Sequence, residues 1–416
     1  MWQPIQGNIH SIHNFRFIEE NIVSDRQVVV LSAVRTAIGD YGGSLKSFPA
    51  NQLAALVTRE AVDRSGVGPD QFGHCVFGNV AHSEPRDMYL ARCAALEGGL
   101  PKEVPAFTLN RLCGSGLQAV ISAAQAILLG DCDVAVAGGA ESMSRVPYHL
   151  PAMRWGARMG DSVAVDAMTE ALQDPFRKYH MGVTAENIAQ KWSISRRDQD
   201  ALALESHRRG ANAIRSGRFT DQILPVEVKS RKGVTKFDKD EHVREDVSEE
   251  QLAGLRTIFK EDGSVTAGNA SGINDAAAAV VLAEAGTAAR SGMQPLGRMV
   301  AYAHAGVEPE YMGIGPVPAI KMVLAKAGLS ASDIDVYELN EAFAAQALAV
   351  IRDLDLPMDR TNPNGSGISL GHPIGATGCI LTVKALYELH RTGGRYACVS
   401  MCIGGGQGIA AIFEKA

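Results

Sequence analysis

A repeated order of strand, turn and helix constrains the fold of this 416-residue chain more than any other feature. Three pairs of distinctive residues recur in the same order, each pair separated by about 260 positions. The pairs are Asn79 and Asn340, Cys113 and His372, and Gly138 and Gly404. This self-similarity predicts two copies of one αβ unit, and strand–helix alternation predicts α/β layers. Pairing the two halves would bring Cys113 and His372 to facing helix starts.

Hydrophobic runs and glycines predict the elements of each copy. In the first half we expect strands at residues 27–31, 74–79 and 133–139, with helices at 52–64 and 117–128. In the second half we expect a helix at 319–327, a helix ending near residue 391, and strands at 335–339, 396–400 and 409–413.

Residues 145–265 interrupt this pattern with a polar, charge-rich stretch that is interpreted as an inserted lobe. Its basic residues are Arg208, Arg209, Lys229, Arg231, Lys232, Lys236 and Arg244. Such charges usually form a solvated surface, but they could also cradle phosphates. The two readings are nearly balanced. The net charge of −6 leaves an anionic ligand few other anchors and slightly favours the cradle.

Composition excludes several classes of protein. A net charge of −6 argues against a nucleic-acid binder, which needs a basic surface. Seven scattered cysteines predict reduced thiols in a cytoplasmic protein, and their spacing predicts no metal site. No stretch approaches the roughly 18 apolar residues of a membrane span. The first 26 residues lack the apolar core of a secretory signal and are interpreted as an extension.

Cys113 is the first candidate for chemistry because it stands in a glycine-rich turn just before a predicted helix. A helix N-terminus carries partial positive charge and free N–H groups, which favour a thiolate and can bind an oxyanion. Most free cysteines are only small buried hydrophobes. The glycines at 114 and 116, and a histidine at the equivalent position of the other half, favour catalysis.

His372 precedes Pro373, a residue suited to the first position of a helix, so we expect an exposed imidazole able to act as a general base.

Cys402 lies before a glycine run that could suggest a dinucleotide site. That reading fails, because only eight residues follow Gly408 and no helix can form there. The glycines fit better as backbone that approaches a thioester.

Two further features keep two interpretations each. Asn340 could hold a water by its carboxamide, or it could simply end a strand. Met181, Met312 and Phe343 could line a pocket, although such residues usually belong to the core.

Six stretches in order identify a family. The segments around Cys113, His372 and Cys402, and residues 180–182, 266–272 and 340–343, resemble the thiolase superfamily. More narrowly, the chain is similar to biosynthetic β-ketothiolases (acetyl-CoA acetyltransferases) of bacterial polyhydroxyalkanoate-type pathways. The resemblance runs from about residue 28 to the C-terminus.

The resemblance implies a five-layered αβαβα fold made of two similar halves, a loop domain over the active site, and a homotetramer. The implied segments are an extension at 1–26, a first half at 27–144 that resumes at 266–294, a loop domain at 145–265 and a second half at 295–416. Its implied partners are acetyl-CoA and 3-ketoacyl-CoA. Coenzyme A is a substrate or product, and no cofactor, metal, nucleic acid or membrane is expected.

The resemblance also assigns roles. Cys113 would be the acylated nucleophile, His372 its activating base, and Cys402 the acid or base at the substrate's α-carbon. One oxyanion site would be a water on Asn340 together with His372, and the other would be the N–H groups of Cys113 and Gly404. His180, Arg244 and Ser271 would contact coenzyme A, and Leu172, Met181, Met312 and Phe343 would lie near the pantetheine or acyl chain.

Three alternatives remain open to test. The enzyme could be a degradative 3-ketoacyl-CoA thiolase of β-oxidation with a preference for longer chains. It could be a non-catalytic acyl-CoA or lipid carrier, which the three reactive residues disfavour. It could be a decarboxylating condensing enzyme of the ketoacyl synthase type, which the second cysteine disfavours. Chain-length preference and physiological direction do not follow from the sequence.

Overall fold

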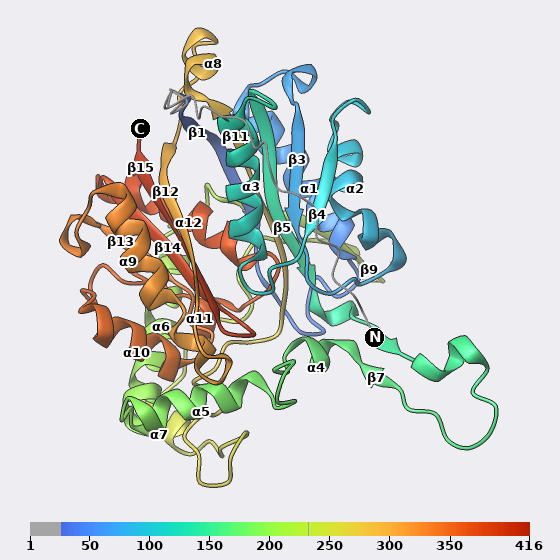
Figure 1. Cartoon of the computed structure of the whole chain (residues 1–416), viewed down its shortest axis with the longest axis vertical. Helices are drawn as coiled ribbons and strands as arrows, with labels where there is room; N and C mark the ends of the chain where they lie inside the picture. The colour runs from blue at the N-terminus through green and yellow to red at the C-terminus, as the bar shows by residue number, and fades with distance from the viewer. Residues whose placement is uncertain (1–25, 232) are drawn as a thin grey trace, which may run out of the picture.

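The computed structural model describes residues 26–231 and 233–416. The predicted extension at 1–26 therefore lies, apart from Arg26, outside the described residues. The two halves occupy opposite sides of the molecule, with the first half in blue to teal and the second in orange to red, and much of the inserted segment lies below them (Figure 1).

The first half contributes one block of strands and helices. Its strands are β1 (Val28–Thr36), β2 (Gly39–Asp40), β3 (His74–Gly78), β4 (Ala106–Leu109), β5 (Val134–Ser142) and β11 (Asn274–Glu284), and its helices are α1 (Ala50–Ser65), α2 (Leu90–Glu97) and α3 (Ser115–Leu129). The short helix α8 (Ala285–Arg290) leads to the second half.

The second half repeats the same order. Its strands are β12 (Gly297–Gly306), β13 (Val336–Leu339), β14 (Tyr396–Ile403) and β15 (Gln407–Lys415), and its helices are α9 (Pro316–Ala327), α10 (Ala344–Leu354), α11 (Gly367–Leu370) and α12 (Thr377–Thr392). The predicted elements are all present. Most extend a few residues further than expected, because apolar periodicity ends before backbone pairing does.

Strand order shows the duplication directly. The first half runs β4-β3-β5-β11-β1 and the second runs β13-β14-β15-β12. In the first half two parallel pairs are followed by two antiparallel pairs, and in the second half one parallel pair is followed by two antiparallel pairs. The second half lacks a full counterpart of β4, but Thr361 bridges Tyr337 in parallel at that place. Two residue pairs between β1 and β12 join both halves into one sheet of eleven strands among the described residues.

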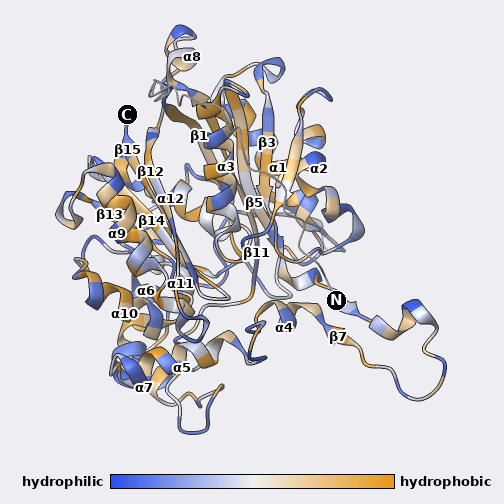
Figure 2. Cartoon of the chain, viewed as in Figure 1, coloured by the Kyte–Doolittle hydropathy of each residue, from blue (hydrophilic) through white to orange (hydrophobic). Residues whose placement is uncertain are grey.

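Helices alternate with the strand layers. On one side, α1 packs on β1, β5 and β11, and α3 covers the opposite face of β3 and β5. On the other, α12 packs on β13 and β14, and α9 covers β12 and β15. Because α3 and α12 pack against each other, they form the central layer. The order α1, sheet, α3 with α12, sheet, α9 is the predicted five-layered αβαβα fold, and apolar residues follow its central strands (Figure 2).

The inserted segment carries short elements and two longer helices. They are β6 (Tyr148–His149), β7 (Val165–Asp166), β8 (Ile223–Leu224), β9 (Val226–Ser230), β10 (Gly233–Phe237), α4 (Ala167–Ala171), α5 (Met181–Lys191), α6 (Arg196–Arg215) and α7 (Glu249–Ala253). The segment is not independent of the core, since β8 pairs with β1 and α6 packs on α10 and α11. The predicted domain limits at 144/145 and 265/266 stay predictions.

A buried ion pair connects the insertion to the first half. Arg35 on β1 donates to both carboxylate oxygens of Asp240, at 2.7 and 3.0 Å, and both side chains are fully buried. Asp240 also accepts the N–H of Ile38 at 2.8 Å. These bonds hold the segment that leads to Arg244 against the core.

Candidate active site

A cavity of about 480 Å³ lies where the two halves and the insertion meet. Three of the predicted catalytic residues line it, namely Cys113, His372 and Gly404. All of the predicted substrate contacts line it as well, and these are Leu172, His180, Met181, Arg244, Ser271, Met312 and Phe343. The structure thus brings together residues spread over more than half of the chain.

A strained turn presents Cys113. Leu112 adopts a left-handed conformation (φ 46°), which is unfavourable for a branched side chain. Hydrogen bonds maintain it: Asn110 Oδ1 accepts the Leu112 N–H at 2.8 Å, and Ser115 Oγ donates to the Leu112 carbonyl at 2.7 Å. Helix α3 begins at Ser115, so Cys113 stands just outside the helix and remains partly exposed. Strain of this kind concentrates at functional sites.

The position of Cys113 beside a helix start does not by itself make its thiol acidic. Burial raises the pKa of the Cys113 thiol to about 11. The N–H groups of Gly404 and of Cys113 itself hydrogen-bond to the sulfur and lower this pKa, but they do not offset burial. The resting group is therefore a thiol. A base must remove its proton before it can attack, and two N–H groups already converge on the reacting atom.

His372 is a neutral base candidate. Burial lowers its pKa to about 4, so the imidazole carries no charge at neutral pH. Its backbone N–H donates to Asn274 Oδ1 at 2.9 Å, Nδ1 lies 2.6 Å from Thr377 Oγ1, and Nε2 lies 3.4 Å from Asn340 Nδ2. The ring is buried rather than exposed as predicted, because the two halves close over it.

The start of the following helix also differs from the prediction. Pro373 is not at the first helical position, since α12 begins only at Thr377. Residues 373–376 form a turn in which the Pro373 carbonyl accepts the N–H groups of Ala376 and Thr377. Gly371 precedes this turn with φ +103°, where a β-carbon would overlap the Asn274 amide. The loop around His372 is therefore built on Asn274 rather than on a helix end.

Cys402 lies behind the cavity wall. It is fully buried in β14 and packs in one cluster with Met181, Met312 and Phe343. Burial raises the pKa of Cys402 far above its usual range, and a negative charge on the nearby Cys113 would raise it further. Cys402 thus stays protonated and lies within electrostatic reach of Cys113. Met181, Met312 and Phe343 fit both interpretations given above, since they belong to a core cluster and also line the cavity.

Asn340 lies beside His372 at the end of β13. Its side chain is fully buried, and Oδ1 has no hydrogen-bond partner among the described residues. A buried carboxamide oxygen without a partner is costly unless something binds it. The carboxamide is therefore free to orient a small polar group next to the histidine.

The predicted coenzyme A contacts occupy the outer part of the cavity. His180 caps α5, its Nδ1 accepts the Gly182 N–H at 3.0 Å, and its ring stacks on Phe259 at 4.6 Å between centroids. This leaves Nε2 as the ring's free polar atom. Arg244 is exposed at the rim, and its backbone N–H donates to His207 Nδ1 at 3.1 Å.

The wider phosphate cradle is not supported. Arg208 and Arg209 both pair with Glu205, and Arg209 also donates to the carbonyl of Thr361. Arg209 therefore connects α6 to the second half, whereas Arg208 pairs within α6. Of the predicted basic residues in the described part of the chain, Arg244 is the one that lines this cavity.

Sequence reasoning missed four residues around the site. Asn274 and Thr377 hold His372. Glu141 accepts the N–H groups of Val80, Ala81 and Gly375, and so ties the first half to the turn of His372. Burial raises the pKa of Glu141 to about 8. His242 lines the cavity and pairs with Asp40. A weak signal existed for Glu141, which follows the glycine-rich end of β5.

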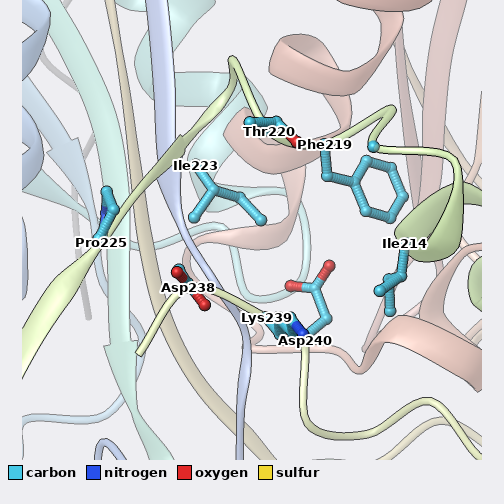
Figure 3. A pocket seen from close by; sticks show the side chains of 9 residues that line it. Ile214, Phe219, Thr220, Ile223, Pro225, Asp238, Lys239 and Asp240 are labelled. Carbon is cyan, nitrogen blue, oxygen red and sulfur yellow. The ribbon is translucent and has the colours of Figure 1, made fainter. Parts of the chain in front are cut away.

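A second cavity, of about 190 Å³, lies near the end of α6 and carries no comparable chemistry (Figure 3). Its charged wall includes Asp240, whose carboxylate is committed to Arg35. No cysteine or histidine lines this cavity. In the described part of the chain, no group of three or more His, Cys, Asp or Glu residues could hold a metal ion.

One helical segment contradicts a sequence prediction. Residues Leu112–Leu129, which include α3, reach a mean hydropathy of 1.6 over 18 residues, enough by length and composition for a membrane span. The expectation that no stretch approaches this limit was wrong. The helix packs between the first-half strands and α12, which accounts for its apolar composition.

Two alike α/β halves with a cysteine, a second cysteine and a histidine at their junction define a class of enzyme, the cysteine-dependent acyltransferases of layered αβαβα fold. The chain belongs to the thiolase family. The family model of the thiolase N-terminal domain matches residues 28–286, and that of the thiolase C-terminal domain matches residues 293–415.

Individual relatives agree with this assignment. Beta-ketothiolase BktB of Cupriavidus necator is 64% identical over 391 residues, which cover 94% of this chain and 99% of that protein. The crystal structure of the Bacillus anthracis acetyl-CoA acetyltransferase has a TM-score of 0.92 at 47% identity, covering 94% of this chain and 99% of that one. The crystal structure of human mitochondrial 3-ketoacyl-CoA thiolase has the same TM-score and coverage at 45% identity.

Proposed function

We propose that this enzyme is a β-ketothiolase of the biosynthetic type that works through an acyl group on Cys113. It joins two acyl-CoA molecules, acetyl-CoA with acetyl-CoA or with a longer acyl-CoA, by a reversible Claisen condensation to 3-ketoacyl-CoA. The reverse reaction is CoA-dependent thiolysis. The observation that carries the proposal is the cavity at the junction of the two halves, where Cys113, His372 and the Gly404 backbone lie on the wall beside all of the predicted substrate contacts.

Acylation uses His372 as the base. Its neutral imidazole takes the proton from the Cys113 thiol, and the thiolate attacks the thioester carbonyl of the first acyl-CoA. The carbonyl oxygen becomes negative and is stabilised by the N–H groups of Cys113 and Gly404. The tetrahedral intermediate then expels the CoA sulfur, which takes the proton from His372. The products are acyl-Cys113 and free CoA.

The carbon–carbon step uses Cys402. In thiolysis, the Cys113 thiolate attacks the keto carbon of 3-ketoacyl-CoA, and the bond to the α-carbon breaks. The departing enolate takes a proton from the Cys402 thiol, which its raised pKa keeps protonated until then. The proton that His372 took from Cys113 returns to Cys402. In condensation the same transfers run backwards, with the Cys402 thiolate removing the α-proton.

The enolate oxygen needs a second oxyanion site. We assign this role to His372 and to a water oriented by Asn340, whose carboxamide oxygen is buried without a partner among the described residues. Two sites are needed because charge develops on two different carbonyl oxygens during the cycle.

The proposal is tested by removing the thiol of Cys113. Replacing Cys113 with alanine should abolish CoA-dependent cleavage of acetoacetyl-CoA, whereas retained cleavage would refute the proposal. The carrier alternative predicts acyl-CoA binding without any turnover by the wild-type protein. The ketoacyl synthase alternative predicts decarboxylation of a malonyl thioester, and an assay for that reaction separates it.

The biosynthetic reading rests on the 64% identity to BktB, against 45% to the human mitochondrial 3-ketoacyl-CoA thiolase. A degradative enzyme should favour longer chains. Measuring kcat/KM for thiolysis of 3-ketoacyl-CoA substrates from C4 to C10 decides between them: a decline with length supports the biosynthetic role, and a rise supports the degradative one.

We further propose a cytoplasmic homotetramer that needs no cofactor or metal and has no nucleic-acid or membrane partner. What supports the oligomer is an arm spanning residues 145–166, which extends away from the body of the molecule (Figure 1). Its large apolar side chains are exposed to solvent. The exposed fraction is 84% for Trp155 and 92% for Met159. Exposed apolar clusters of this kind usually mark interfaces. Replacing both residues with serine should reduce the mass of the assembly measured by light scattering.

A further inference from the structure

The neutral imidazole of His372 carries one ring proton, on either Nδ1 or Nε2. Only one of these two tautomers suits its role as a base. For Nε2 to accept the proton of Cys113, the neutral ring must carry its own proton on Nδ1. Among the described residues, the ring nitrogens contact Thr377 and Asn340, both neutral, and burial lowers the pKa of His372. The proton position must therefore come from neutral hydrogen bonds.

The hydrogen bonds of Thr377 supply this preference. Thr377 is the first residue of α12, and its hydroxyl donates to the carbonyl of Pro373 at 3.0 Å, four residues earlier. A hydroxyl has one proton to donate. Once that proton faces Pro373, Thr377 Oγ1 can only accept at its 2.6 Å contact with His372 Nδ1, which places the ring proton on Nδ1.

The hydrogen-bond partner on the opposite side of the ring is consistent with a proton on Nδ1. Asn340 Nδ2, a donor, faces His372 Nε2 at 3.4 Å, which suits a nitrogen with a free lone pair. The backbone N–H of His372 is held separately by Asn274 Oδ1 at 2.9 Å. Two carboxyl groups lie further along the network: Glu141 on β5 accepts the N–H of Gly375 in the same turn at 2.8 Å, and Asp40 accepts from Asn274 Nδ2, but neither is hydrogen-bonded to the ring.

We infer that Thr377 is a positioning residue that fixes the Nδ1–H tautomer of His372, so that the Nε2 lone pair faces the substrate side of the site. This inference rests on the proposed role of His372 as the base. It explains why the partner is a hydroxyl. A carboxylate at Nδ1 would stabilise the imidazolium and keep the proton on the ring. A neutral hydroxyl orients the ring without charge, so His372 can return the proton within the same cycle.

The hydrogen bond between Thr377 and His372 also suits the second proposed role of the ring, which is to stabilise the enolate oxygen. When His372 is protonated, Nδ1–H still binds Thr377 and the new N–H is on Nε2. That N–H is the one available to a negative oxygen. One ring orientation therefore serves both proton removal from Cys113 and stabilisation of the enolate, with no need for the ring to turn.

The test compares two substitutions at one position with a matched control on the same helix. Thr377→Val keeps the shape and removes the hydroxyl, and Thr377→Ser keeps the hydroxyl. Thr382→Val removes a hydroxyl that makes the same kind of bond, to the carbonyl of Gly378 at 2.9 Å, but does not touch His372. Each variant is assayed for thiolysis of acetoacetyl-CoA and for alkylation of Cys113 by iodoacetamide from pH 6 to pH 10.

Loss of one neutral hydrogen bond should lower kcat of Thr377→Val about tenfold, with KM within about twofold of wild type. At pH 7 its alkylation should slow by about the same factor. The difference should shrink toward pH 10, because hydroxide then replaces the base and the pKa of Cys113 is about 11. Thr377→Ser and Thr382→Val should match wild type in both assays.

Two results would overturn the inference: equal kcat in Thr377→Val and Thr382→Val, or an alkylation deficit in Thr377→Val that is the same at every pH. The first would leave the hydroxyl without a role in proton transfer, and the second would indicate a displaced Cys113. Failure of the proposed function looks different, because wild-type protein would then not cleave acetoacetyl-CoA at all.

Discussion

Gly116, three residues after Cys113, should be intolerant of even one added carbon. A β-carbon there would lie 2.7 Å from the backbone nitrogen of Cys379 and 3.0 Å from the carbonyl oxygens of Gly375 and Ala376. All three atoms belong to the backbone that carries His372 into α12, so no side chain can move aside. A β-carbon on the corresponding glycine of the other half, Gly378, would lie still closer to the backbone nitrogen of Leu117.

The size of the effect follows from this geometry. A carbon needs about 3.5 Å from a non-bonded heavy atom, so the Gly116→Ala side chain must push α3 and the turn of His372 apart by about 0.8 Å. Overpacking of this kind costs about 1–3 kcal/mol of unfolding free energy. A displacement near 1 Å between reacting groups lowers the rate by about 100-fold. We therefore expect activity to fall much more than stability.

The assay pairs kcat for acetoacetyl-CoA thiolysis with urea unfolding. The control is Gly254→Ala, at an exposed position where the nearest atom to the new β-carbon would be 3.4 Å away and the backbone is ordinary (φ −74°). The control should keep both wild-type values. The reasoning would be refuted if Gly116→Ala retained kcat within about twofold of wild type, since the contact between the halves would then not set the catalytic distance.

Three more outcomes follow from the structure. Arg35→Met leaves the fully buried Asp240 unpaired, so the free energy of unfolding should fall by about 3–5 kcal/mol in urea titration; a loss below 1 kcal/mol would contradict this. Cys402→Ala should still form acyl-enzyme from acetyl-CoA but lose condensation, and equal loss of both by rapid quench would show that the cysteines share one role. Because burial holds the pKa of Cys113 near 11, alkylation of Cys113 should keep rising up to about pH 11; a plateau above about pH 9 would indicate an ordinary exposed thiol.

Much of the architecture was predictable because the duplication is recorded in residue spacing. The repeat placed Cys113 against His372 before any contact was known, and α3 and α12 meet as that repeat requires. Motif resemblance placed the cavity residues on the insertion, such as Arg244. Spacing alone could not have done this, because the path of an irregular segment depends on anchors such as the Arg35–Asp240 pair.

What escaped prediction depends on burial and on hydrogen-bond direction, which a residue's identity does not reveal. Cys113 beside a helix start suggested a thiolate, yet desolvation outweighs the N–H groups that bind its sulfur. Pro373 suggested a helix start, yet a turn intervenes before Thr377. Thr377 itself resembled any helix-forming residue, and its role depends on which way one hydroxyl points.

The most direct test of the account is to find where the acyl group resides. Wild-type protein mixed with acetyl-CoA, quenched in acid and analysed by intact mass and peptide mapping should carry one acetyl group, on Cys113. That group should be absent from Cys113→Ala and should be released by added CoA. Acetylation of Cys402 or of another residue, or no acyl-enzyme from an enzyme that is turning over, would contradict the proposed division of labour between the two cysteines.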